Sequence, residues 1–150
     1  MQLRGFKFIS SYEKNDLRLP TRKTQYSAGY DIAAAEDVLL APASVTLVPT
    51  GIKAYMQSDE YLGIHIRSGL SIKKNLSLVN GQGIIDADYF NNNENEGHIF
   101  IAIYNHSSQS IPINKGTRIA QGIFYKYLLA DHDENNLFIT RTGGFGSTGQ

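Results

Sequence analysis

The segment YLGIHI, residues 61–66, decides the fold class of this chain. Its large apolar residues recur at every second position, which is the period of a half-buried β-strand. Val45 and Leu47 alternate in the same way. Residues 99–103 are continuously apolar and residues 119–127 largely so, as in strands covered on both faces. Because Pro, Gly and Asn separate these short runs, the pattern predicts an all-β sandwich, jelly roll or barrel.

One short helix is expected directly after this strand. Ser68 is placed to cap a turn that runs through Ile72 to Lys74. The chain has 150 residues, which is most simply a single domain with a real core.

The composition argues against several classes of protein. Basic and acidic residues balance, 14 against 14, so no basic surface for a nucleic acid is expected. No apolar run is long enough to cross a membrane, and the N-terminus lacks the core of a signal peptide. The absence of cysteine excludes disulfides and thiol catalysis, and the four histidines lack metal-ligand spacing. We therefore expect a cytoplasmic protein, or one in the host cytoplasm if a phage encodes it.

The segment GQGIIDADY, residues 81–89, holds most of the chemistry. Its glycines allow a tight bend with exposed backbone N–H and C=O groups. Ile84 and Ile85 are expected to deliver Asp86 from inside the core, and Tyr89 places an aromatic face beside the bend. Together these groups predict a pocket for a planar, polar ligand. A hairpin in which the acid only favours the turn remains the alternative on the local pattern.

The other polar clusters are individually weak. Asp31 follows a turn, for which a structural role is sufficient. Arg67, Ser68 and Gly69 offer a guanidinium, a hydroxyl and an amide to an anionic oxygen, although a surface ion pair is as common. Gln121 lies on an apolar strand and needs a partner if it is buried.

Two segments are expected to lie outside the packed core. The run from Asn91 to Glu96 is polar and of low complexity, which predicts an exposed loop tip that does not pack. Residues 143–150 are rich in glycine and carry one ring, Phe145. A disordered terminus is the ordinary interpretation. A flexible arm that closes over a ligand is the alternative.

Five motifs in order resemble the trimeric dUTPase family and cover most of the chain. They are AGYDIAA at 28–34, RSGL at 67–70, residues 80–89 continued at 97–99, GTRIAQ at 116–121 and GGFGSTG at 143–149. One such match is weak, whereas five in order are strong. The resemblance implies a distorted jelly-roll β-barrel with one short helix over residues 1–140, and a flexible C-terminal arm over residues 141–150. It also implies a homotrimer whose sites lie at subunit interfaces, where the arm reaches a neighbouring site.

The same resemblance implies hydrolysis of dUTP to dUMP and pyrophosphate with Mg²⁺. Asp86 would be the general base for the water that attacks the α-phosphorus. The triphosphate would hold most of the Mg²⁺ coordination sphere, with Asp31 in the outer shell through water. Arg67, Ser68 and Gln121 would contact or support the phosphates, and Gly69 would belong to the same binding site.

The third motif would select the base and the sugar. The hairpin backbone with Asn80, which includes Gly83 and Ile85, would pair with the uracil edge and leave no room for a 5-methyl group. Tyr89 would pack on the deoxyribose, where a 2′-OH would clash.

The fifth motif would close the site. Phe145 would stack on the uracil, Gly146 would belong to the same binding site, and Ser147 and Thr148 would meet the phosphates. Arg141 is the candidate for the γ-phosphate, although it lies one residue closer to the glycine pair than in the family.

One departure and two alternatives remain at this level. The family usually has Tyr, one residue, then Gly, whereas here the loop 91–96 intervenes. Such an insertion is tolerated because the entropic cost of closing a loop grows slowly with its length, and the loop is available to a protein partner.

A dCTP deaminase shares the fold but needs a Glu where this chain has Ala102. A non-catalytic binding protein is the second alternative, against which the intact Asp86, Tyr89 and Phe145 argue.

Overall fold

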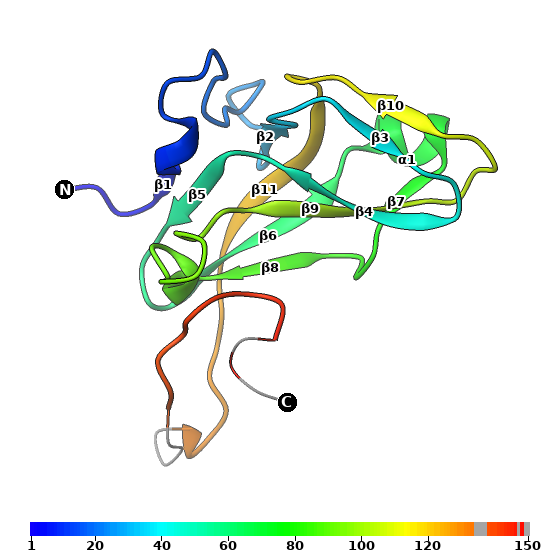
Figure 1. Ribbon diagram of the computed structural model, residues 1–150. Coiled ribbons are helices and arrows are strands. Elements are labelled where there is room, and N and C mark those ends of the chain that lie inside the picture. Colours follow the sequence, from blue (N-terminus) through cyan, green and yellow to red (C-terminus); the bar gives the residue numbers. More distant parts are fainter. Residues whose placement is uncertain (134–137, 147, 149–150) are drawn as a thin grey trace.

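The computed structural model describes residues 1–133, 138–146 and 148, and this part of the chain is built mainly from short strands (Figure 1). The strands are β1 (Gly5–Phe8), β2 (Tyr30–Ala33), β3 (Val38–Leu40), β4 (Ser44–Pro49), β5 (Ile52–Tyr55), β6 (Glu60–Ile66), β7 (Leu76–Leu78), β8 (Gly83–Asp86), β9 (Phe100–Asn105), β10 (Ile111–Ile113) and β11 (Arg118–Lys126). The helices are α1 (Ser68–Lys74) and the 3₁₀ turns η1 (Ser10–Tyr12) and η2 (Ala87–Tyr89).

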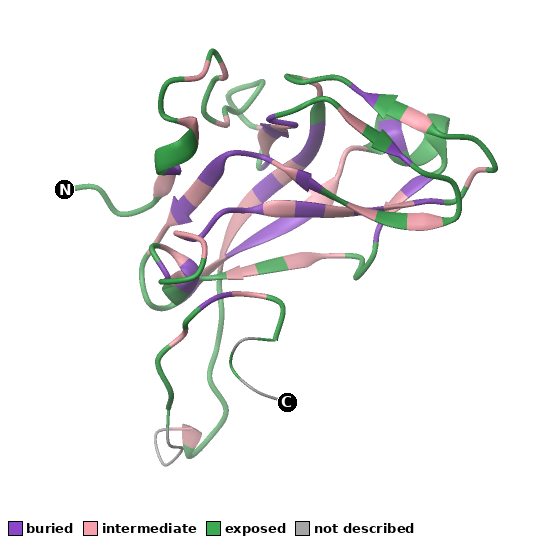
Figure 2. Ribbon diagram, viewed as in Figure 1, coloured by how far each residue is buried: buried purple, intermediate pink, exposed green. Residues whose placement is uncertain are grey.

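Two larger antiparallel sheets enclose the core. One has the strand order β2-β11-β6-β8 and the other β4-β9-β7, with the pairs β1-β5 and β10-β3 beside them. Ile32 and Leu62 of the first sheet and Ile101 and Ile103 of the second belong to one buried cluster (Figure 2). The all-β jelly-roll prediction is confirmed, although among the described strands the hydrogen bonds form four sheets and do not close one continuous barrel.

The strand β6 joins the two ends of the molecule that carry the predicted site residues. At its start Tyr61 pairs with Asp86 of β8, and further along Ile64 pairs with Gly83. At its other end His65 pairs with Gln121 of β11. The register of this single strand therefore fixes how far apart these chemical groups lie.

Two local predictions about burial were wrong. Ile84 is 59% exposed and Asp86 points outward, so the acid is not delivered from the core. The reason is that Ile84 and Asp86 are two residues apart and therefore lie on the same face of β8, and this face meets solvent. Likewise Val45 and Leu47 are about half exposed, because Val48 supplies the buried contact of β4.

The short helix is confirmed, but its start differs in detail. Ser68 is the first helical residue rather than the cap, and Arg67 occupies the N-cap position without a side-chain capping bond. Asn75 ends the helix in the left-handed conformation, with φ of 54°, which Asn tolerates better than most residues.

The loop 91–96 was wrongly expected to be an unpacked tip. Asn92 is only 7% exposed, and its side-chain oxygen accepts hydrogen bonds from the backbone N–H groups of Glu94 and Asn95. Short amide side chains fold a polar loop on itself by replacing backbone partners in this way. Low complexity in composition therefore does not prevent this segment from packing.

The C-terminal segment leaves the sheets after Lys126. Figure 1 shows this segment descending from β11 and returning as the red coil that passes beside β8. No helix in the described part of the chain has both the length and the apolarity needed to span a membrane.

Candidate active site

A cavity of about 200 Å³ lies between the strand β8, the strand β9 and the returning C-terminal segment. It is smaller than the roughly 300–1,000 Å³ of drug-sized ligand sites, so it suits part of a nucleotide rather than all of one. Half of the residues predicted for the site line it: Asn80, Gly83, Ile85, Asp86, Tyr89, Arg141 and Phe145. The third and fifth motifs, far apart in sequence, therefore meet here.

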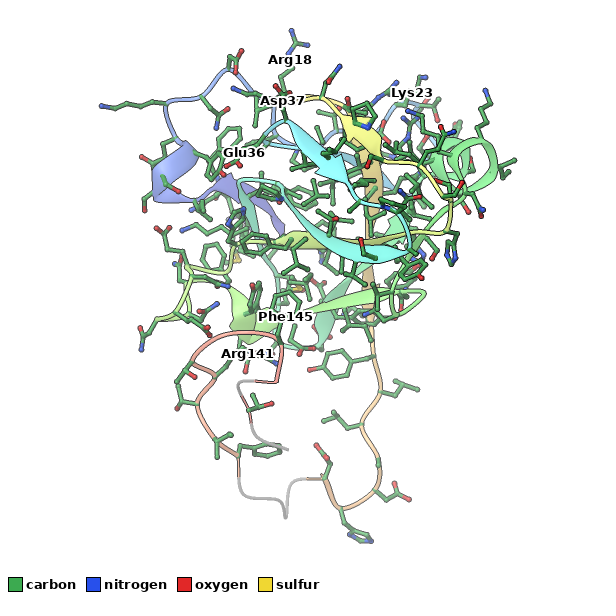
Figure 3. All side chains as sticks on the ribbon, turned by 45° about the vertical axis from the view of Figure 1, so that its right-hand side comes forward. Arg18, Lys23, Glu36, Asp37, Arg141 and Phe145 are labelled. Carbon is green, nitrogen blue, oxygen red and sulfur yellow. The ribbon has the colours of Figure 1, made fainter. Side chains whose placement is uncertain are left out.

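Asp86 lies at the end of β8 and faces the C-terminal arm. Its carboxylate is half exposed and accepts a charge-assisted hydrogen bond of 2.6 Å from Arg141. The same guanidinium donates to Asp88 at 2.7 Å, because the 3₁₀ turn η2 keeps Asp86 and Asp88 on the same side. Figure 3 shows Arg141 and Phe145 directed from the arm toward the barrel. A phosphate can bind Arg141 fully only if these two ion pairs give way.

Tyr89 forms one wall of the cavity and is held firmly. Its side chain is 6% exposed, and its hydroxyl donates to the backbone C=O of His98 at 2.6 Å. Burial raises the pKa of Tyr89, so the phenol remains neutral and available as a donor. The arm lies against this ring, since a Cβ added to Gly144 would come within 3.0 Å of the Tyr89 Cε2 atom.

His98 supports this wall from behind. The backbone N–H of Gly51 donates to its Nε2 atom at 2.9 Å, which requires an unprotonated nitrogen. Burial lowers the pKa of His98, and the nearby Glu36 and Glu96 only partly oppose that effect. The imidazole therefore acts as a neutral, structural acceptor, in agreement with the sequence interpretation.

A second polar cluster lies at the far end of β6 and combines the first, second and fourth motifs. Asp31 pairs with Arg118 at 3.1 Å, and Arg67 Nε lies 3.8 Å from the same carboxylate. The Gln121 side chain packs on Gly29, where an added Cβ would approach its Oε1 atom to 2.4 Å. A separate hollow beside Asp31 and Arg118 is also lined by the side chains of Arg18 and Lys23, labelled in Figure 3.

The two clusters are too far apart in one chain to share a reacting group. Tyr61 pairs with Asp86, and Arg67 lies six positions beyond Tyr61 along the chain. At about 3.3 Å per residue this corresponds to about 20 Å. A general base must lie within one water of the atom it serves. Hence Arg67 and Ser68 lie out of reach of Asp86 in the same chain.

The carboxylates do not form a metal cage. In residues 1–133, 138–146 and 148, no three acidic or histidine side chains are grouped as metal ligands. Asp31 is already paired with two arginines, so its oxygens suit an outer-shell role through water rather than a direct bond to Mg²⁺. The donor set thus fits an ion that is held mainly by a substrate.

Comparison with known proteins identifies the family. A sequence model of the dUTPase family matches residues 15–149. The chain is 49% identical to the deoxyuridine 5′-triphosphate nucleotidohydrolase of Lactococcus lactis, over 99% of each chain. It belongs to the dUTPase family.

Solved dUTPase structures agree with this assignment. The dUTPase of Streptococcus mutans superposes with a TM-score of 0.81 at 45% identity and covers 85% of this chain and 98% of its own. A D95N mutant dUTPase from phage phi11 of S. aureus, described with a structural Mg(II) ion, has a TM-score of 0.72 at 21% identity. It covers 91% of this chain and 99% of its own, and shows the shared fold alone.

The cavity also separates this dUTPase from the related deaminases. Ala102, where a deaminase would need its acid, lines the cavity wall on β9. An alanine that lines the cavity cannot exchange a proton with a bound base, which argues against deamination at this position.

The remaining predicted residues lie elsewhere in this dUTPase. Ser68 and Gly69 begin α1 and are exposed, and neither Gly146 nor Thr148 forms part of the described cavity wall. Ser147 lies outside the described residues. Sequence reasoning missed Asp88, the second partner of Arg141. Its only signal was the spacing of two acids in the motif.

Proposed function

We propose that this chain hydrolyses dUTP to dUMP and pyrophosphate, with Asp86 as the general base. Membership of the dUTPase family carries the activity. Asp86 supports the role of base because its carboxylate is half exposed at the mouth of the cavity. It can therefore orient a water and accept its proton as that water attacks the α-phosphorus in line.

Selection of base and sugar rests on the cavity. We assign the uracil edge to the backbone of β8 between Gly83 and Ile85, with Asn80 beside it. β8 is an edge strand, so the backbone groups it does not share with β6 remain available for a base edge. The buried ring of Tyr89 would lie on the deoxyribose and leave no space for a 2′-OH. Phe145, which is 75% exposed on the arm, is free to stack on the base.

The phosphates need groups that the cavity lacks. Arg67, Ser68 and Gln121 offer a guanidinium, a hydroxyl and an amide, but they belong to the cluster about 20 Å away along β6. We therefore propose a homotrimer in which this cluster of one subunit completes the cavity of another. Exposed apolar side chains such as Val45, Leu47 and Ile84 are available to be covered in such an assembly.

The C-terminal arm, residues 141–150, would close the site in the assembled enzyme, and residues 1–140 would form the barrel domain. Here the arm lies against the cavity of its own chain through Arg141 and Gly144. In the trimer we expect it to cover a neighbouring cavity, where the same arginine would exchange its carboxylates for the γ-phosphate. Thr148, with Ser147, would then approach the phosphates.

Mg²⁺ fits this arrangement as a partner of the substrate. When bound, it neutralises charge on the triphosphate and on the pyrophosphate that leaves. Asp31 would contact it through water, while the protein aligns the phosphates with Arg67, Ser68 and Gln121. Since dUTP belongs to the cellular nucleotide pool, we place the enzyme in the cytoplasm, or in host cytoplasm if phage-encoded.

A substrate panel tests this function. Pyrophosphate release is measured with dUTP, dCTP, dTTP and UTP, with and without Mg²⁺. We expect rapid release from dUTP only, and about a 10²–10⁴-fold lower kcat for Asp86→Asn with dUTP still bound. Formation of a uracil nucleotide from dCTP, or a full rate for Asp86→Asn, would refute the assignment.

A further inference from the structure

The loop 91–96 is a folded unit attached to the backbone of Tyr89. Its ends meet, because Asn91 N–H donates to Glu96 C=O at 2.9 Å, and Asn92 Nδ2 donates to Tyr89 C=O at 2.7 Å. Asn92 Nδ2 also donates to Asn95 Oδ1 at 2.8 Å, and Asn95 Oδ1 accepts from Gly97 N–H at 3.0 Å. The conformation of the loop is therefore held by hydrogen bonds between its own residues and to Tyr89 and Gly97.

One side chain of this loop contacts the hydroxyl group of Tyr89. Asn95 Nδ2 donates to the Tyr89 hydroxyl at 2.9 Å, while that hydroxyl donates to His98 C=O at 2.6 Å. Both the acceptor and the donor capacity of the phenol are thus used. With Asn92 on its backbone and Asn95 on its hydroxyl, Tyr89 is fixed at both ends.

The outer end of the loop is also bound to the rest of the protein. Glu96 accepts hydrogen bonds from the backbone N–H and the hydroxyl of Ser10, and it forms a 3.1 Å ion pair with Lys53. Lys53 also donates to Asn91 Oδ1 at 2.7 Å. These contacts hold the pKa of Glu96 below its usual range, first through Ser10 and then through Lys53. Asn95 therefore projects from an anchored frame rather than from a mobile tip.

The arm meets the same unit. Glu94 N–H donates to Thr142 C=O at 3.0 Å, and Gly144 lies on the Tyr89 ring that Asn95 holds. A side chain on Gly143 would collide with Glu94, since an added Cβ would lie 1.4 Å from its Oε2 atom. The loop is thus packed between the sugar-facing ring and the chain that closes the cavity.

We propose that the loop 91–96 is a specificity device in which Asn95 is a positioning residue for Tyr89. By fixing the phenol hydroxyl, Asn95 holds the ring at the angle that excludes a 2′-OH from the cavity. This inference rests on the proposed role of Tyr89 in sugar selection. On this proposal the inserted loop acts inside the active site. Binding of a protein partner at the outer surface of the loop would not need the hydrogen bond from Asn95 to Tyr89.

The test compares discrimination between dUTP and UTP in matched variants. For Asn95→Ala we expect the ratio of kcat/KM for dUTP over UTP to fall about fivefold, as for loss of one neutral hydrogen bond. The lower ratio should arise mainly from a lower KM for UTP, with kcat and KM for dUTP nearly kept, because a ring that is free to tilt no longer excludes the 2′-OH. Asn93→Ala is the control, since Asn93 lies exposed in the same loop. It should leave both the ratio and the KM unchanged.

A double variant separates positioning from general disruption. If Asn95 acts through the hydroxyl, then Tyr89→Phe and Tyr89→Phe/Asn95→Ala should have the same dUTP/UTP ratio. Should Asn95→Ala fail to fold, Asn95→Asp keeps the acceptor oxygen for Gly97 and replaces the amide donor to Tyr89 with a charged acceptor.

Three results overturn the inference. These are an unchanged ratio in folded Asn95→Ala or Asn95→Asp, effects of the two substitutions that multiply in the double variant, or an equal loss for Asn93→Ala. Failure of the underlying sugar role is distinguished by Tyr89→Ala, because an unchanged ratio there would remove Tyr89 itself from selection. Loss of selectivity in Tyr89→Ala but not in Asn95→Ala refutes only the positioning role.

Discussion

Mixing two inactive variants should restore activity if the site is divided between subunits. Asp86→Asn removes the base from the cavity, and Arg67→Ala removes a cation from the cluster at the other end of β6. Loss of a base or of one electrostatic contact costs about 10²–10⁴-fold in rate, so each parent should retain at most about 1% of wild-type activity. Neither substitution alters the group that the other variant lacks.

The expected recovery follows from counting. About 20 Å of β6 separates the two groups in one chain, so a working site must take Asp86 from one subunit and Arg67 from another. With equal, random mixing in trimers, half of the subunits supply an intact base and half supply an intact cation. Because ½ × ½ = ¼, about a quarter of the sites regain both groups. Denaturing the two variants together, refolding them and measuring pyrophosphate release from dUTP should give about 25% of wild-type activity.

A matched mixture provides the control. Asp86 and Tyr89 line the same cavity, so Asp86→Asn mixed with Tyr89→Ala cannot assemble a site that holds both intact residues. This mixture should give the mean of the two parental activities and no recovery beyond it. The reasoning is refuted if the Asp86→Asn and Arg67→Ala mixture remains at the parental level while sedimentation shows mixed trimers, or if both mixtures recover equally.

Further variants address the arm, the pH response and the loop. Removing residues 141–150 should leave a folded trimer with at least a 100-fold lower rate, and an unchanged rate would restore the interpretation as an idle terminus. Because the pKa of His98 is lowered by burial, below about pH 6.5 the unfolded chain binds a proton that the folded chain resists. The Tm at fixed protein concentration should therefore fall more from pH 7 to pH 5 in the wild type than in His98→Gln, and parallel curves would contradict this. Gly97→Ala should lower the free energy of unfolding in urea by about 2–4 kcal/mol, because φ is +89° and the new Cβ would lie 2.7 Å from Tyr89 C=O. Gly81→Ala, with φ of +73° and open space around its Cβ, should cost only about 1 kcal/mol, and equal losses would exclude the steric argument.

The fold was predictable where one physical rule acted alone. Alternation in residues 61–66 identified β6, and runs of apolar residues identified β9 and β11. Burial alternates along β9, however, so this strand is not covered on both faces as expected. The rule gave the wrong face for Val45 and Leu47, which are about half exposed. An alternation with a period of two residues shows that the two faces of a strand differ in polarity, but it does not say which face packs on the core.

The site was predictable as a set of residues but not as an arrangement. The motifs selected Asp86, Tyr89 and Arg141, which line one cavity in this chain, whereas the arm was expected to reach the cavity of a neighbouring subunit. They could not show that Arg141 would pair with Asp88, since this contact depends on the path of the chain after β11. The role of the loop 91–96 was hidden for another reason. Asparagine is typical of exposed turns. In the folded chain, however, Asn92 is buried and donates a hydrogen bond to the backbone C=O of Tyr89.

Strand geometry makes the assembly part of the chemistry rather than only a source of stability. β6 is hydrogen-bonded to β8 and β11 along its length, so no loop movement within one chain can bring Arg67 to Asp86. The arm carries a single guanidinium, that of Arg141, which already pairs with two carboxylates. A triphosphate bound at this cavity would therefore lack most of its counter-charge in an isolated chain. We therefore expect an isolated chain to bind base and sugar, and catalysis to require a second subunit that brings its Arg67 cluster to the cavity mouth.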